Sequence, residues 1–293
     1  MFSISSPRLN FLLTIMNTLF KNKKIILGGA VFFAALGLAL AYVSTPSGAL
    51  EVHFFDVGQG DAIFIETPNG RQVLIDGGRD ARVIEKLGRV MPFYDRSIDL
   101  VVATHMDSDH IGGLLMVLRQ FEVGGILVST TESNTELSEA FWGIIKEKDI
   151  AVMQVERGDN FLLDDGVNML VLAPWPELLN GAKDNDTSVV VKLTYKNDSF
   201  LFTGDLEKRG EYALVQSGID VTADVLKLGH HGSKTSSVPL FLARVAPRLV
   251  LIQVGKNSYG HPHPSVLERL RGVNVLRNDI RGDITLYSYG DSF

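Results

Sequence analysis

The segment HMDSDH, residues 105–110, places two histidines and two aspartates within six positions. It follows the run VVAT, residues 101–104, whose β-branched Val101 and Val102 are typical of a buried strand. Imidazole and carboxylate groups are costly to bury unless something compensates for their lost hydration. Because a bound metal ion is the usual compensation, the segment predicts metal chemistry at the end of a buried strand.

Polar turns also follow four other predicted strands. These turns are Asp76-Gly77-Gly78, Gly204-Asp205, Gly229-His230-His231-Gly232-Ser233 and the segment GKNSYGHPHP, which contains His261 and His263. Apart from His53, every histidine of the chain lies in these turns or in residues 105–110. Side chains at the ends of neighbouring strands in α/β folds converge at one edge of the sheet. The pattern therefore predicts one site built from several strand ends.

Short apolar strands alternate with helix-period segments from Leu50 onward, which predicts an α/β fold with two sheets and helices outside them. The expected strands are 51–57, 62–66, 72–75, 99–104, 125–128, 169–172, 188–193, 200–203, 224–228, 249–254 and 284–287. The expected helices are 81–90, 114–120, 136–148, 206–216, 239–245 and 264–271. We expect residues 50–293 to form a single domain.

The turn GQGD, residues 58–61, resembles a phosphate-binding loop at first sight. It is too short for one and lacks the GK[ST] ending, so a hairpin turn between antiparallel strands is the better interpretation. Asp61 in this turn is free to face the site.

The composition limits the chemistry of any such site. The chain has 293 residues, a net charge of −6 and no cysteine. Disulfides and thiolate ligands are excluded, so a metal would be bound by His, Asp, Asn or water. The negative charge excludes a broad basic surface for nucleic acid, although a metal site can hold a phosphate locally.

Residues 25–43 form an uncharged apolar run that is long enough to cross a bilayer as a helix. Lys21, Lys23 and Lys24 precede it, so the positive-inside rule predicts a cytoplasmic segment 1–24 and an extracytoplasmic catalytic domain. These features predict a single-pass membrane protein. A cleaved signal peptide is the competing interpretation.

The motifs HxDxDH, LIDGG, FTGD and HHGS resemble those of the metallo-β-lactamase superfamily, whose first motif reads HxHxDH. Here Asp107 stands at the middle histidine of that motif. The segments DVGQGDA, NDTSVVV, LKLGHHGSKTSS and YGHPHPSVLERL are similar to the metallo-hydrolase domain of the ComEC family of DNA-uptake competence proteins. The resemblance covers residues 50–290. It implies an αββα sandwich, here preceded by the predicted transmembrane helix, and two divalent metal ions, zinc or manganese.

By this resemblance a set of histidines and aspartates would bind the two ions. The implied ligands are His105, Asp107, Asp109, His110, Asp205, His231 and His261, with Asp205 bridging both ions and His263 as a weaker candidate. The sequence does not decide which of His230 and His231 is the ligand. The third-motif histidine of the superfamily has no counterpart, and Asn185 or Asp186 stands in its region.

The resemblance also implies groups that act beside the ligands. Asp76 would orient a ligand or the bridging water, Asp109 would serve catalysis, and His230 would protonate the leaving oxygen. We expect Ser233, Lys234 and Asn185 to contact the substrate phosphate. A solvated loop is an equally good explanation of Lys234.

Two divalent ions lower the pKa of a bridging water and clamp the oxygens of a scissile phosphate. The leading hypothesis is therefore a metal-dependent phosphodiesterase, a nuclease linked to DNA uptake or processing. ComEC proteins carry a polytopic membrane channel and this chain has one predicted span, so a separate channel subunit is a candidate partner. The alternatives are hydrolysis of another ester, such as a phosphorylcholine or lactone bond, and a non-catalytic membrane-tethered binding protein.

Overall fold

The computed structural model describes residues 27–35, 37, 48–129, 135–175 and 184–291. The chain divides into two units, Met1–Thr45 and Pro46–Phe293. In the first unit, residues 27–35 are helical. A helix of this length rises about 14 Å, roughly half of the hydrocarbon core of a bilayer.

No helix in the described part of the chain combines the length and the apolar character that a membrane crossing requires. The single-pass membrane location that the sequence analysis derived from residues 25–43 is therefore wrong. Residues 25, 26, 36 and 38–43 of that range, and the whole predicted cytoplasmic segment 1–24, lie outside the described residues.

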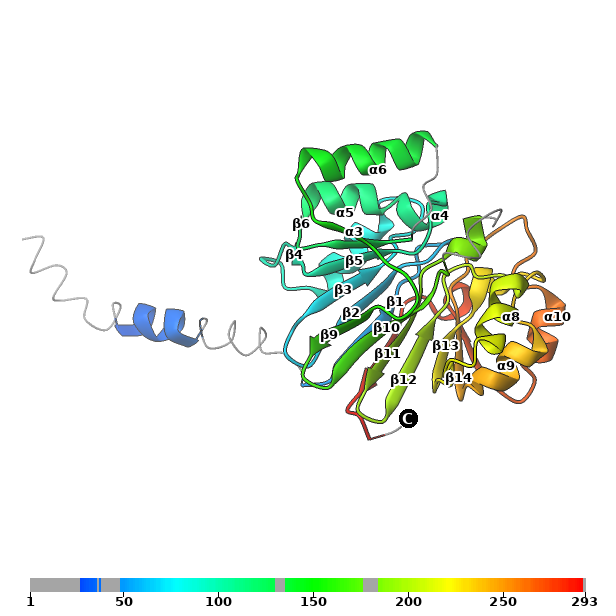
Figure 1. The fold of residues 1–293 in the computed structure, drawn as a ribbon. Helices are drawn as coiled ribbons and strands as arrows, with labels where there is room; N and C mark the ends of the chain where they lie inside the picture. Colours follow the sequence, from blue (N-terminus) through cyan, green and yellow to red (C-terminus); the bar gives the residue numbers. More distant parts are fainter. Residues whose placement is uncertain (1–26, 36, 38–47, 130–134, 176–183, 292–293) are drawn as a thin grey trace, which may run out of the picture. The chain divides into compact units, whose positions relative to one another are not determined.

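The second unit contains two seven-stranded sheets packed face to face, with helices over both outer faces (Figure 1). The first sheet has the order β16-β1-β2-β3-β5-β7-β8. Its strands are β1 (Leu50–Phe54), β2 (Ile63–Glu66), β3 (Gln72–Ile75), β5 (Leu100–Ala103), β7 (Ile126–Val128), β8 (Val152–Gln154) and β16 (Ile284–Ser288). The helices α3 (Arg82–Val90), α4 (Ser108–Ile111), α5 (Leu114–Gln120) and α6 (Glu136–Glu147) accompany this sheet.

The second sheet has the order β15-β14-β13-β12-β11-β10-β9. Its strands are β9 (Asn160–Asp164), β10 (Val167–Ala173), β11 (Val190–Tyr195), β12 (Asp198–Phe202), β13 (Val225–Lys227), β14 (Leu249–Ile252) and β15 (Asn274–Arg277). Its outer helices are α8 (Lys208–Gln216), α9 (Pro239–Val245) and α10 (Pro264–Arg269). Short elements complete the unit: β4 (Ser97–Ile98), β6 (Glu122–Val123), α11 (Asn278–Arg281) and two 3-10 turns, Asp184–Thr187 and Gly229–Gly232.

Alternating side chains explain why the layers stack in this order. Successive residues of a strand face opposite sides of the sheet. In β12, Phe200 and Phe202 enter the core between the sheets, whereas Leu201 faces the outer helices. In β3, Val73 and Ile75 face the other sheet, and Leu74 faces α3 and α5. Both sheets are thus apolar on both faces, and the predicted α/β fold with two sheets is confirmed.

The core between the sheets should carry much of the stability of this unit. Phe54 is fully buried there, with its ring 6.1 Å from that of Phe202. Replacing Phe54 by alanine should cost about 3–5 kcal/mol of unfolding free energy, because a cavity remains between two rigid sheets. Phe93→Ala is the matched control, since Phe93 is 77% exposed and its loss should change stability by about 0.5 kcal/mol or less. Chemical denaturation measures both values, and equal losses would contradict this description of the core.

Candidate metal centre

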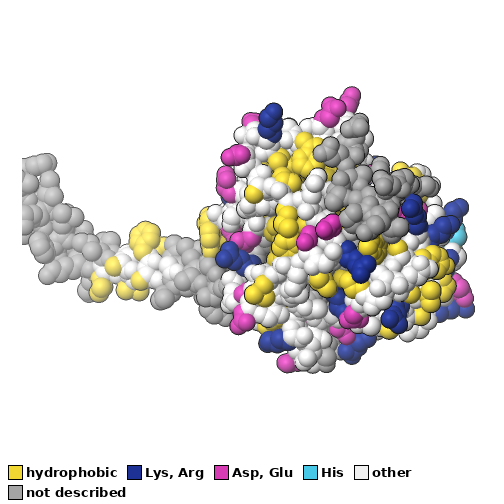
Figure 2. Space-filling model, in the orientation of Figure 1, with side chains coloured by type: hydrophobic (Ala, Val, Ile, Leu, Met, Phe, Trp, Pro, Cys, Tyr) yellow, Lys and Arg dark blue, Asp and Glu magenta, His cyan; other side chains and the backbone are white. Residues whose placement is uncertain are grey.

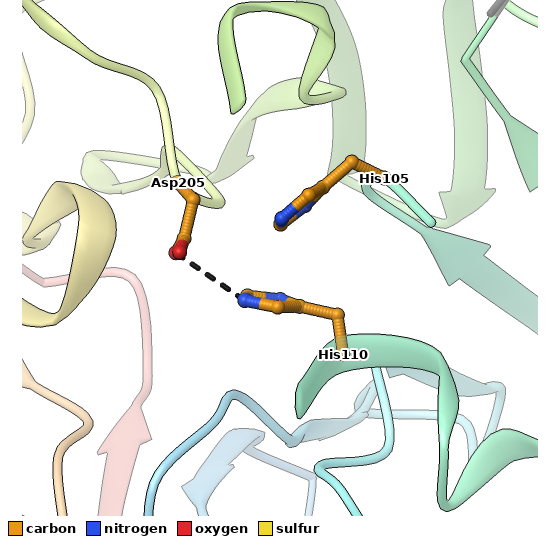
Figure 3. A group of neighbouring side chains, drawn as sticks. All are labelled: His105, His110 and Asp205. Atoms are coloured by element: carbon orange, nitrogen blue, oxygen red, sulfur yellow. Dashed lines mark ion pairs between the residues drawn. The ribbon is translucent and has the colours of Figure 1, made fainter. Parts of the chain in front are cut away.

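Side chains of the HMDSDH segment and of the later turns meet where the ends of the two sheets adjoin. His105 follows β5, His110 lies in the short helix α4, and Asp205 follows β12 of the other sheet. Figure 3 shows these three side chains pointing toward one another. Asp205 Oδ1 lies 3.4 Å from His110 Nε2. The site is therefore assembled from both sheets.

Asp76 fixes the orientation of His110 from behind. The Asp76 carboxylate is fully buried and accepts hydrogen bonds from the backbone N–H and the hydroxyl of Thr104 at 2.8 and 2.7 Å. Its Oδ2 also lies 2.7 Å from His110 Nδ1. A carboxylate can only accept here, so the N–H at Nδ1 of His110 donates to Asp76, and Nε2 faces the centre.

His105 and His231 are oriented in the same way, by a hydrogen bond at Nδ1. The Thr104 hydroxyl donates to Asp76, so it accepts from His105 Nδ1, 3.0 Å away. His231 Nδ1 donates to the backbone carbonyl of Gln253 at 2.8 Å. In all three histidines the outer nitrogen is occupied by a hydrogen bond, and Nε2 is free to bind a metal.

The residues present fit a metal centre. The Nε2 atoms of His105, His110 and His231 and Asp205 Oδ1 are buried, and none of them has a hydrogen-bond partner among the described residues. Among the described residues, four sets of three ligand atoms lie within 4.8 Å of one another, and two of them consist of predicted ligands alone: His105, His110 and Asp205, and Asp109, His110 and His231. Unpaired buried polar atoms are costly, whereas a divalent cation would satisfy them together.

The electrostatics of the site favour a cation at the same place. Burial opposes the charge of Asp205, yet the neighbouring His231 and His110 hold its pKa well below the usual value. Burial likewise disfavours protonation of His231, but the charges of Asp205 and Asp61 raise its pKa to about 10. The carboxylates thus attract positive charge strongly, whether it comes as protons or as a metal ion.

A buried ion pair borders the centre. Asp61 and Lys227 are both about 1% exposed, and their charged groups are in direct contact. Lys227 Nζ also donates to the carbonyl of Gly204 at 2.8 Å and lies 3.8 Å from Asp205 Oδ1. Asp61 Oδ1 lies 3.3 Å from His231 Nδ1. The pair therefore links the 58–61 turn to β13 and to the carboxylate at the centre.

The turn that carries Asp61 is fixed by a close backbone approach. Gly60 has a φ of +132°, and a Cβ on it would lie 2.2 Å from the carbonyl oxygen of Asp109. Only glycine allows this contact, because any side chain would collide with the backbone. The strands on either side, β1 and β2, are antiparallel neighbours, as the sequence predicts.

The other predicted ligands lie at the rim of this group. Asp109 Oδ2 is 3.5 Å from His231 Nε2, and Asp107 Oδ2 is 3.5 Å from His105 Nε2, although the side chain of Asp107 is 43% exposed. The ring of His261 lies 5.4 Å from that of His230, and its Nδ1 is buried without a partner among the described residues. Burial and the nearby charges of His230 and His231 lower the pKa of His261 to about 4.

The predicted substrate-contacting residues differ in burial and in their distance from His230. Asn185 Nδ2 and Glu207 Oε1 are each 3.2 Å from His230 Nδ1. Ser233 is buried and its hydroxyl is 2.8 Å from that of Thr235, behind His230. Lys234 is exposed. A substrate contact for Asn185, Ser233 and Lys234 stays a prediction.

A cavity of about 480 Å³ opens onto the centre. Its lining includes Asp107, Asp109, Asp205, His230, His231 and His261. On the remaining walls are Gln59, Arg79 and Tyr259, which the sequence did not single out. Arg79 is the only lysine or arginine among the described lining residues. A substrate in this cavity would therefore meet one guanidinium as well as the candidate ligands.

Lys227 and Gln253 were also missed by the sequence analysis, although both leave a signal. Each is a single polar residue in an otherwise apolar run, LKLG and LIQVG. Such a residue needs a partner when it is buried. Lys227 pairs with Asp61, and the side-chain amide of Gln253 donates to the carbonyl oxygens of Phe55 and Ala62. The backbone carbonyl of Gln253 accepts the hydrogen bond from His231 Nδ1.

A family model described as the metallo-beta-lactamase superfamily matches residues 55–255, which include most of the sandwich and most of the centre. The chain belongs to the metallo-beta-lactamase superfamily.

Three bacterial proteins resemble this chain over most of its length. ComE operon protein 3 of Bacillus subtilis is 34% identical over 80% of this chain, and competence protein ComA of Neisseria gonorrhoeae is 32% identical over 82%. Recombination protein 2 of Haemophilus influenzae is 28% identical over 89%. The aligned part is 32% of each relative, so the chain spans about a third of their length.

Solved structures show the same fold at low identity. The metallo-beta-lactamase fold protein YhfI from Bacillus subtilis matches with a TM-score of 0.55 and 12% identity, over 82% of this chain and all of that one. CmlA, a diiron β-hydroxylase from Streptomyces venezuelae, matches with a TM-score of 0.54 and 16% identity, over 83% of this chain and 54% of that one. These matches agree with the two-sheet superfamily fold.

Asp76 offers a test of the outer layer of this superfamily site. Asp76→Asn should weaken metal binding about 10- to 100-fold. Both oxygens of Asp76 accept hydrogen bonds, from Thr104 and His110, whereas the NH₂ group of an asparagine would point its own N–H at one of these donors. Asparagine tolerates the φ of +58° at this position, so the backbone should stay in place. Titration with zinc or manganese, followed by calorimetry, measures the change.

The control for Asp76→Asn is Asp80→Asn, which makes the same chemical change four residues away. Asp80 is about half exposed and pairs with Arg82. Its variant should bind metal as the wild type does. Equal affinities for all three proteins would mean that Asp76 does not orient a ligand.

Proposed function

We propose that this chain is a metal-dependent phosphodiesterase, most simply a nuclease, of the metallo-hydrolase type. The observation that carries the proposal is a cluster of buried histidine Nε2 atoms and an aspartate oxygen without hydrogen-bond partners among the described residues, next to a cavity that has an arginine in its wall. His105, Asp107, Asp109, His110, Asp205 and His231 would hold two divalent ions, with His261 at the rim. Bound ions would supply an activated water and charge neutralisation for a phosphate.

The chain's own residues account for the rest of the reaction. Asp76, Thr104 and the Gln253 carbonyl hold the three histidines with Nε2 inward. Arg79 can hold a phosphate oxygen at the cavity wall, where a planar guanidinium suits a phosphate. His230 has its Nε2 3.8 Å from Asp205 Oδ2, so it can protonate a leaving oxygen next to the centre.

The relatives' names support a phosphodiester of nucleic acid as the substrate, since two of them are named for competence or its operon and one for recombination. On the face in Figure 2, acidic and basic side chains are interspersed over the described surface. DNA would therefore be attracted mainly by the cavity and its bound cations. A separate subunit that supplies a membrane channel belongs to the same proposal, with residues 50–293 as the hydrolase domain.

The experiment is an activity screen of the full chain loaded with zinc or with manganese. The substrates are single- and double-stranded DNA, RNA, bis(p-nitrophenyl) phosphate, a phosphorylcholine ester and a lactone. We expect metal-dependent cleavage of the phosphodiesters, abolished by chelation. Cleavage of the lactone or the phosphorylcholine ester alone would replace the proposal by its ester-hydrolase alternative, and metal binding without any turnover would favour a binding protein.

A further inference from the structure

Glu207 lies directly behind His230 and has no role in the site described so far. It follows β12 by five residues and precedes the first turn of α8. Its Oε1 is 3.2 Å from His230 Nδ1, and its side chain is 14% exposed. On the opposite edge of the same ring, Nε2 faces Asp205 Oδ2 and the cavity. The imidazole of His230 therefore lies between the Glu207 carboxylate and the candidate metal centre.

The carboxylate is itself held in place. The Thr235 hydroxyl donates to Glu207 Oε1 at 2.8 Å, and the Ser233 hydroxyl lies 2.8 Å from that of Thr235. The backbone adds a second tie, since the Lys208 N–H donates to the Thr235 carbonyl at 2.9 Å. The GSKT turn after the two histidines thus supports Glu207 rather than lining the cavity.

We infer that Glu207 is a positioning residue for His230: it holds the proton on Nδ1 and directs Nε2 to the oxygen that leaves the phosphorus. This inference rests on the proposed function. Water attacks phosphorus, and the bond from phosphorus to the leaving oxygen breaks with its electron pair going to oxygen. That oxygen takes a proton from the N–H at Nε2 of His230, the electron pair of this N–H bond remains on Nε2, and Nδ1 keeps the proton that Glu207 holds. The proton lost by the attacking water goes to solvent.

The Glu207 carboxylate contributes by its charge as well as by its hydrogen bond. A charge-assisted hydrogen bond to a carboxylate is about twice as strong as one to a neutral group. Asn185 offers the competing arrangement, because its amide N–H could donate to Nδ1 only if the ring proton sat on Nε2. The two contacts therefore predict opposite tautomers of neutral His230, which makes the inference testable without any metal.

The first measurement is the tautomer of His230 in the metal-free full chain, by long-range ¹⁵N–¹H correlation at a pH where this ring is neutral. We expect the Nδ1–H form in the wild type and a shift toward the Nε2–H form in Glu207→Gln. An Nε2–H ring in the wild type, or no change in the variant, would overturn the inference.

The second measurement compares two leaving groups with metal-loaded full-length protein. p-Nitrophenolate leaves bis(p-nitrophenyl) phosphate without needing a proton near neutral pH, whereas the nucleoside alkoxide that leaves dithymidine monophosphate needs one. Glu207→Gln should lower kcat for the dinucleotide about 10- to 100-fold and leave KM and the nitrophenyl ester nearly unchanged. Equal losses for both esters, or none, would contradict the inference.

Glu85→Gln is the matched control, because Glu85 is exposed and pairs with Arg89 on α3. It should behave as the wild type in both measurements, and the metal content of all three proteins should be equal. If the wild type cleaves neither ester, the proposed function fails, and the tautomer still decides whether Glu207 positions His230.

Discussion

Asp205→Asn should lose bound metal and all metal-dependent hydrolysis. The two oxygens of Asp205 face the metal-binding nitrogens of different histidines, with Oδ1 3.4 Å from His110 Nε2 and Oδ2 3.4 Å from His231 Nε2. Losing an outer partner of a ligand costs 10- to 100-fold in affinity, so losing this group should cost about 100-fold or more. Elemental analysis after equilibration with zinc or manganese measures the loss.

Thermal denaturation gives an independent measure of the same effect. A ligand at about 1,000 times its dissociation constant stabilises the folded state by about 4 kcal/mol, and Asp205→Asn should lack this gain. The metal-free variant should be slightly less stable than the metal-free wild type, because His231, His110 and Lys227 all surround this carboxylate with positive charge. The carboxylate therefore stabilises the metal-free fold instead of straining it.

Asp220→Asn is the control for Asp205→Asn, since Asp220 pairs with Lys192 at the surface. It should keep the metal content and the activity of the wild type. Wild-type metal content and turnover in Asp205→Asn would exclude the proposed centre.

Lys227→Met should destabilise the fold by about 3–5 kcal/mol, with or without metal. The substitution preserves apolar volume but leaves the buried carboxylate of Asp61 without its cation, and unpaired buried charges carry the largest penalties. Burial already opposes the charge of Asp61, and Lys227 is the main group that holds its pKa below the usual value. Chemical denaturation of the metal-free protein measures the loss.

Lys192→Met provides the matched comparison in strand β11 of the same sheet. Lys192 is also largely buried, but its partner Asp220 is 69% exposed and keeps its hydration when the lysine is lost. That substitution should cost about 1 kcal/mol or less. The double variant Lys227→Met with Asp61→Asn should recover part of the loss. A cost for Lys227→Met no larger than that for Lys192→Met would mean that the Asp61 pair contributes little.

The fold could be predicted because its strands are buried on both faces. Continuous apolar runs such as QVLI in β3 and LVLI in β14 can hardly be anything else between two layers. The strands that the sequence analysis missed are β8, β9 and β15, besides the two-residue β4 and β6. β8 is exposed along its whole length, and all three lie at sheet edges, where one-sided burial leaves a weak pattern.

The site could be predicted only in part. Residues 105–110 and Asp205 could be predicted because charged side chains come within a few residues of the end of an apolar strand. The order of His230 and His231 could not be read, since both have positive φ and the choice depends on the Gln253 carbonyl 22 residues away. Likewise, Asp107 and Asp109 look equivalent in the motif, but the fold buries Asp109 more deeply than Asp107. Local sequence does not show which distant backbone group lies behind a ring.

Each of the two sheets provides part of the candidate metal centre, so the centre can form only when the sheets pack together. His105 and His110 come from the first sheet, whereas Asp205 and His231 follow strands of the second, roughly a hundred residues later in the chain. Neither sheet alone completes a ligand set that contains Asp205. A bound ion would connect the two sheets through their side chains and would slow amide hydrogen exchange in both sheets near this edge. Tight metal binding would thus require that the two sheets have already packed together during folding. Before that stage, only half of the ligands would be available to an ion.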